Sequence, residues 1–101
     1  GCGCGKLFEG TAKQMFNSLQ KIKSLKTTTK IYCAHEYTLN NIRFAMTEEV
    51  NNIELSARYK RTINKNITLP SSLSEELATN PFLRAANSDE LKGIRERKDV
   101  F

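Results

Sequence analysis

The sequence predicts an α+β fold that is mainly α-helical. Apolar residues recur at helical spacing through most of the chain, and several of these stretches begin at a residue that suits a helix N-cap. One short run, residues 30–34, is instead rich in β-forming side chains. The 101 residues suffice for one modest domain. We therefore expect one helix–strand unit followed by about four helices.

The first third of the chain predicts the helix–strand unit. It opens with GCGCGKLFEG, and glycines in such a loop let the backbone turn sharply or approach a ligand closely. Thr11 is the expected N-cap of a helix that runs to about Leu25. Residues 30–34 are expected to form a buried strand. Because a single strand cannot form a sheet, it should pair with another chain, or the sequence is the back part of a larger α/β protein.

The remaining sequence predicts helices joined by short connections. A turn is expected at residues 80–81, followed by Phe82 and Leu83 as core residues. The expected helices, with their caps, are residues 38–50 (Thr38), 53–64, 72–78 (Ser72 with Glu75 as a capping box) and 88–100 (Ser88).

Composition and charge exclude several classes of protein. Apolar residues make up 39% and charged residues 27%, which is ordinary for a soluble globular protein. No apolar run approaches the roughly 18 residues that cross a bilayer, and no signal-peptide pattern is present, so we expect a cytoplasmic protein without a membrane partner. The net charge of +5 comes from scattered residues without a nucleic-acid motif. A small anionic ligand explains it at least as well, and a basic nucleic-acid binder is the weakest alternative.

The three cysteines are expected to be free, reduced thiols. Their number is odd, and Cys2 and Cys4 are too close together for a disulfide framework. A tetrahedral zinc site of Cys2, Cys4, Cys33 and His35 is an alternative, but their spacing does not match known zinc-binding folds.

His35 is the only histidine, and it stands between the expected strand and the next helix. This position is where α/β proteins commonly bind ligands. A neutral imidazole there can coordinate zinc or iron, with the following Glu36 or a backbone carbonyl fixing its tautomer. A structural histidine is the alternative that composition leaves open.

The last helix places two cations on its apolar side. Leu91, Ile94, Arg95 and Lys98 follow the i, i+3, i+4, i+7 spacing of one helical stripe. A helix that docked only through apolar residues would not carry cations there. Arg95 and Lys98 are therefore candidate ligand contacts, with snorkelling at the edge of the core as the alternative.

Four motifs together resemble the C-terminal half of glyoxalase II, the hydroxyacylglutathione hydrolases of the metallo-β-lactamase superfamily. They are GCGKLFEGTAKQM, YCAHEYTLNNIRFA, LPSSLSEE with ATNPFLR, and IRERKD. The resemblance implies a hydrolase with a dinuclear zinc centre, iron or manganese being alternatives, that cleaves S-D-lactoylglutathione to D-lactate and glutathione. It also implies two parts: residues 1–36 as the last helix–strand unit of a metallo-β-lactamase domain, and residues 37–101 as the helical C-terminal domain.

The resemblance further implies roles for individual residues. His35 would be the last protein ligand of the metal centre, and the Tyr37 hydroxyl would bind the glutathione backbone. Arg95 and Lys98 would hold its glycine carboxylate. Lys6, otherwise a solvated charge, would contact a carboxylate, while Phe8 replaces a tyrosine of many relatives and by default packs in the core. The implied substrate-binding residues are Lys6, Leu7, Phe8, His35, Glu36, Tyr37, Arg95 and Lys98.

The family's H-x-H-x-D-H run is absent from the chain, which holds one histidine. We therefore expect a truncated or split enzyme that hydrolyses the thiolester only with a complementary N-terminal half, and that binds the metal pair weakly or not at all by itself. Self-association is a further expectation, because the strand needs a partner. The alternative function is a non-catalytic module that binds a glutathione-like thiol or a protein.

Overall fold

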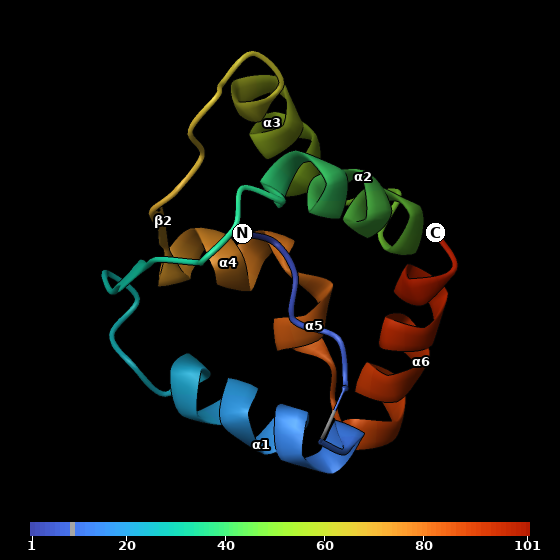
Figure 1. The fold of residues 1–101 in the computed structure, drawn as a ribbon. Coiled ribbons are helices and arrows are strands. Elements are labelled where there is room, and N and C mark those ends of the chain that lie inside the picture. The colour runs from blue at the N-terminus through green and yellow to red at the C-terminus, as the bar shows by residue number, and fades with distance from the viewer. Residues whose placement is uncertain (9) are drawn as a thin grey trace.

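The computed structural model describes residues 1–8 and 10–101, and it is mainly helical, as predicted (Figure 1). None of the helices in this part of the chain is long and apolar enough to span a membrane. The elements are α1 (Ala12–Lys23), β1 (Lys30–Ile31), α2 (Thr38–Glu48), α3 (Ile53–Thr62), β2 (Ser71–Ser72), α4 (Leu73–Thr79), α5 (Pro81–Arg84) and α6 (Ser88–Asp99).

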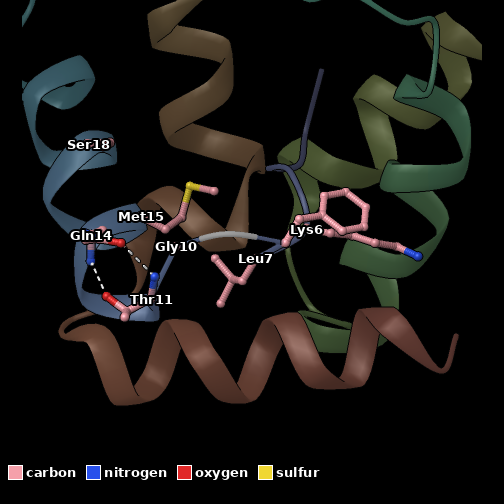
Figure 2. Close-up of a pocket in the computed structure, with 8 residues that line it drawn as sticks. Lys6, Leu7, Gly10, Thr11, Gln14, Met15 and Ser18 are labelled. Carbon is pink, nitrogen blue, oxygen red and sulfur yellow. Dashed lines mark hydrogen bonds between the residues drawn. The ribbon is translucent and has the colours of Figure 1, made fainter.

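Helix α1 begins where the sequence predicted. The Thr11 hydroxyl accepts a hydrogen bond from the Gln14 N–H at 3.1 Å, and the Gln14 side chain accepts one from the Thr11 N–H at 2.9 Å (Figure 2). This capping box satisfies two N–H groups that the first helical turn leaves without partners. The helix ends at Lys23, two residues before the predicted end, and packs against α6 through its buried residue Leu19.

The strand prediction is wrong in length, burial and partner. Strand β1 has two residues, and Tyr32, inside the predicted strand, is 74% exposed. It pairs antiparallel with β2, so that Lys30 faces Ser72 and Ile31 faces Ser71. This partner could not be predicted, because two serines before a helix carry no β pattern. The strand therefore needs no second chain, and the reason given for self-association no longer holds.

Helix α2 starts at Thr38, with Tyr37 rather than Thr38 in the N-cap position. Thr38 is buried, and its Oγ1 lies 2.6 Å from the Thr68 Oγ1. Its hydroxyl therefore joins a tertiary contact instead of capping the helix. Ile42, Phe44 and Ala45 of this helix are buried. The helix buries more than one side because it lies between two clusters of apolar residues.

The second half of the chain follows its predicted order, with shifted caps. Ser72 accepts from the Glu75 N–H at 3.1 Å and caps α4, as predicted. The predicted turn after it is the short helix α5, capped by Asn80. Phe82 and Leu83 are buried, which confirms them as core residues. Helix α6 is capped by Asn87 instead of Ser88.

Two apolar clusters hold the helices together. The larger one joins α1, α2, α4, α5 and α6, and the smaller one joins the N-terminal segment to α2 and α3. The N-terminal segment, blue in Figure 1, runs through the middle of the molecule toward α1. The two predicted parts, residues 1–36 and 37–101, are thus in close contact, and their division into domains stays a prediction. The buried members are Leu19, Phe44, Leu73, Phe82, Leu83, Ala85, Leu91 and Ile94 in the first cluster, and Cys2, Ile42, Ala45 and Leu55 in the second.

A buried ion pair joins α3, α4 and the N-terminal segment. The Arg58 guanidinium donates to the Glu76 carboxylate at 2.6 Å and to the Thr79 hydroxyl at 2.7 Å. The Cys2 N–H donates to the other Glu76 oxygen at 2.7 Å. Burial alone would raise the pKa of Glu76, but the charge of Arg58 and these hydrogen bonds hold it below its usual value of 4.5. Glu76 is therefore ionised inside the fold.

Removal of this carboxylate should destabilise the protein and change its acid sensitivity. A depressed folded-state pKa contributes stability that is present above about pH 4.5 and is lost as the pH falls through the lower folded-state value. We expect Glu76→Gln to lower the free energy of unfolding at pH 7 by about 3 kcal/mol, because the buried Arg58 then keeps only the partly exposed Glu75 carboxylate, at 3.5 Å, as a counter-charge. As the pH falls below about 4.5, the free energy of unfolding of the variant should therefore decline less than that of the wild type. Urea unfolding followed by circular dichroism between neutral and acid pH measures both effects.

The matched control is Glu96→Gln, which neutralises an exposed carboxylate on α6. Its effect should stay within about 0.5 kcal/mol, as for most surface substitutions. Equal losses in the two variants would show that the buried pair contributes nothing specific.

The cysteines should differ sharply in reactivity. All three are free; Cys33 is exposed, whereas burial raises the pKa of Cys2 to about 11. The thiolate is the reactive form, so iodoacetamide should modify Cys33 readily and Cys2 only when the fold opens. Mass spectrometry of the peptides over time measures both rates, and in concentrated urea the two should converge. Equal rates in the folded protein would contradict the buried position of Cys2.

Candidate functional site

One pocket collects most of the residues that the sequence singled out. It encloses about 520 Å³ and is built from the glycine-rich loop, the segment before α2, the first turn of α2 and the end of α6. These segments are far apart in the chain, so the fold alone brings them together. Six of the eight predicted substrate-binding residues line it: Lys6, Phe8, His35, Tyr37, Arg95 and Lys98.

Arg95 forms part of the pocket wall, but its guanidinium is already engaged. Nη1 donates to the Cys4 carbonyl at 2.8 Å, and Nε donates to the Asp99 carboxylate at 3.0 Å. The guanidinium also lies 5.4 Å from the centre of the Phe82 ring. Arg95 is 6% exposed. It therefore fixes the backbone of the glycine-rich loop against α6 and has few N–H groups left for a ligand.

Lys98, one turn further along α6, lies beside two aromatic rings. Its ammonium is 5.6 Å from the ring centre of Phe44 and 5.3 Å from that of Phe101. Burial lowers the pKa of Lys98, and the nearby charge of Arg95 lowers it further. None of its contacts is a carboxylate within salt-bridge distance among the described residues. The Lys98 charge is thus available to an anionic ligand.

His35 and Tyr37, from the segment before α2, also line the pocket. Their rings stack with centres 4.9 Å apart and planes inclined by 17°. His35 is exposed and Tyr37 is 62% exposed. Both the imidazole and the phenol are accessible from the pocket.

Glu36 lies between these two residues in the chain but is not part of the pocket. Its carboxylate accepts hydrogen bonds from the Thr68 hydroxyl at 2.6 Å and from the Thr68 N–H at 3.0 Å. These bonds lower the pKa of Glu36, and the bond from the Thr68 hydroxyl has the larger effect. The structure thus places Glu36 where it ties the segment carrying His35 to the loop before β2.

Leu7 and Phe8 belong to a neighbouring hollow of about 560 Å³ beside α1. Figure 2 shows Leu7 there with Thr11, Gln14 and Met15, while the Lys6 side chain points away from α1. Phe8 lines both hollows and is 85% exposed, so its default role in core packing is wrong. Leu7 does not line the pocket that holds His35.

Four further residues line the pocket that the sequence did not predict as substrate contacts: Cys4, Gly5, Asn40 and Asn41. The two asparagines could have been found, because residues three and four positions after Tyr37 share its side of the helix. Asn41 is partly occupied, since its amide donates to the Gly1 carbonyl at 2.9 Å. Asn40 adds an exposed amide to the wall.

The metal-binding alternatives do not fit this chain by itself. Cys2 is buried and donates from its thiol to the Thr79 carbonyl, whereas Cys33 is exposed. Across residues 1–8 and 10–101, no three His, Cys, Asp or Glu side chains are grouped to hold a metal ion. The four-ligand zinc site is therefore wrong. A dinuclear centre would need ligands beyond those that the described residues bring together.

Comparison with known proteins gives a consistent family. The family model of the hydroxyacylglutathione hydrolase C-terminus matches residues 36–101. The chain is 49% identical to a protein named hydroxyacylglutathione hydrolase from a Synechococcus species and 47% identical to one of the same name from Methylococcus capsulatus. Each match covers 98% of this chain. That of Nitrosomonas europaea is 56% identical across 82% of the chain.

The chain spans less than half the length of these relatives: 45% of the Synechococcus protein, 46% of the Methylococcus protein and 33% of the Nitrosomonas protein. The similarity is nonetheless high, and the family model covers about two thirds of the chain. The chain belongs to the hydroxyacylglutathione hydrolase family and corresponds to the C-terminal part of its members.

Proposed function

We propose that the pocket binds the glutathione part of a thiolester, and that this chain is the substrate-binding part of an enzyme that hydrolyses S-D-lactoylglutathione to D-lactate and glutathione. The observation that carries the proposal is the meeting of Lys6, Tyr37 and Lys98 around one hollow of about 520 Å³. Such a volume is typical of small-molecule sites. The family assignment supplies the substrate.

The charges of the pocket suit this ligand. Glutathione carries carboxylates at its two ends, and Lys6 and Lys98 supply ammonium groups for them. Lys98 is the stronger candidate for direct contact, because Arg95 already binds Cys4 and Asp99. Arg95 then supports binding mainly by holding the glycine-rich loop in place. The Tyr37 hydroxyl and the Asn40 amide are suited to the peptide groups of the ligand.

His35 is proposed as one ligand of the family's metal centre, with zinc as the expected metal and iron or manganese as alternatives. Its imidazole is exposed beside the pocket, at the end that Tyr37 shares. The other ligands would come from residues outside this chain. The hydrolytic step is therefore assigned to the completed enzyme and not to residues of this chain.

Glutathione binding to the 101-residue chain tests the pocket directly. We expect Lys98→Ala to raise the Kd for glutathione about tenfold, the ~1.5 kcal/mol that a charged hydrogen bond contributes. Titration of glutathione into labelled protein, followed by two-dimensional NMR, gives the Kd and maps the perturbed residues. Lys92→Ala is the matched control, since Lys92 is an exposed lysine of the same helix that does not line the pocket. Unchanged affinity in Lys98→Ala would remove Lys98 from the site.

A completed enzyme separates binding from chemistry. The chain is joined to the N-terminal part of the Synechococcus relative, and hydrolysis of S-D-lactoylglutathione is measured. Lys98→Ala should raise KM about tenfold with little change in kcat, because a contact remote from the thiolester is the same in ground and transition states. His35→Ala should instead lower kcat and the metal content.

The chain alone should give no detectable hydrolysis of this substrate. Turnover that persists through repurification and is lost in His35→Ala would contradict this expectation. A non-catalytic thiol-binding module, the alternative function, would bind glutathione but give no turnover after fusion.

A further inference from the structure

Two of the three cationic residues that line the pocket, Arg95 and Lys98, lie against a continuous row of aromatic rings. Phe82, Phe44 and Phe101 form this aromatic row, with ring centres 6.2 Å apart for Phe82 and Phe44 and 5.5 Å apart for Phe44 and Phe101. Arg95 lies over the first ring. The Lys98 ammonium lies 5.6 Å from the ring centre of Phe44 and 5.3 Å from that of Phe101. The row therefore forms a support for the charged wall of the pocket.

We propose that Phe101 is a positioning residue of this pocket: together with Phe44 it holds the Lys98 ammonium at the wall, ready for a carboxylate of the ligand. The proposal rests on the proposed function, since it names how one cation of that site is held. A ring face attracts a cation within about 6 Å of its centre, and both rings meet this condition.

The need for such a device follows from the lysine side chain. Its four-carbon stem has many rotamers, and fixing it only when the ligand arrives would cost affinity. Two ring faces restrict the ammonium before binding. They offer no competing negative charge, unlike the Asp99 carboxylate that engages Arg95. The rings of Phe44 and Phe101, which we call the clamp, therefore order Lys98 and leave its N–H groups for a ligand.

Phe44 and Phe101 differ in what else they do. Phe44 is 2% exposed and belongs to the larger apolar cluster, so its replacement would disturb the fold. Phe101 is 57% exposed and is not among the residues of either cluster. Its ring contacts Phe44 edge to face and lies beside Lys98. Phe101 can thus be changed with little effect on the core.

The test compares Phe101→Leu, which keeps an apolar side chain but removes the ring, with Phe101→Tyr, which keeps the ring. Val100→Ala, an exposed neighbour, is the control. The 101-residue chain is titrated with glutathione, and the Lys98 side-chain signals are followed by NMR. We expect Phe101→Leu to raise the Kd about two- to fivefold, as loss of one partly exposed cation–π contact implies. The upfield ring-current shift of the Lys98 methylene signals should shrink at the same time.

Phe101→Tyr and Val100→Ala should keep both the wild-type affinity and the Lys98 shift. Amide signals of α1 and α3 should stay unchanged in Phe101→Leu, which separates positioning from a general loss of structure. Unchanged Lys98 signals in Phe101→Leu would overturn the clamp. Altered Lys98 signals with wild-type affinity would overturn its role in binding. If wild-type protein binds no glutathione, the proposed function fails and the ligand part of this inference with it, while the Lys98 shift still decides whether the clamp exists.

Discussion

The arrangement of the pocket depends on the buried ion pair of Arg58 and Glu76. Two charges removed from water are costly unless their remaining hydrogen-bonding groups are satisfied. Here those groups are satisfied by the Thr79 hydroxyl and by the backbone N–H of Cys2. The backbone at Cys2 adopts a φ of 61°, in the left-handed region, which costs about 1–2 kcal/mol for a residue with a Cβ. The ion pair thus holds the start of the glycine-rich loop in a conformation that it would not prefer alone.

The loop is fixed again at the residues that follow. The Asn80 amide donates to the Gly3 carbonyl at 2.9 Å, and Arg95 donates to the Cys4 carbonyl. A Cβ on Gly3 would lie 2.7 Å from the Asn41 side-chain nitrogen, so a larger residue there would displace the amide that donates to the Gly1 carbonyl. Helices α2, α4 and α6 therefore hold the backbone that precedes Lys6. The glycine-rich sequence permits this path, and three distant side chains select it.

Local signals in the sequence predicted the features that local physics controls. The caps at Thr11 and Ser72 follow from side-chain oxygens next to free N–H groups. The helical stripe placed Arg95 and Lys98 on the side of α6 that reaches the pocket. Features that depend on distant partners were missed. Nothing in the sequence singled out Arg58 and Glu76, which are 18 residues apart, as a pair. The bond between Arg95 and Asp99 is different, because it joins residues four positions apart on one helix and could have been predicted from that spacing.

The bond between Glu36 and Thr68 has a consequence for how this family can vary. Glu36 directly follows His35, yet its carboxylate is held by a residue 32 positions further along the chain. A mutation at position 68 that removes the hydroxyl would weaken the hold on the segment that carries His35 and Tyr37, because only the backbone N–H of residue 68 would still donate to Glu36. Thr68 would have this effect although it lies outside the pocket. Positions 36 and 68 are therefore coupled through the structure of the pocket. Across relatives, positions 36 and 68 should covary, and a change at one should be tolerated where the other has changed first.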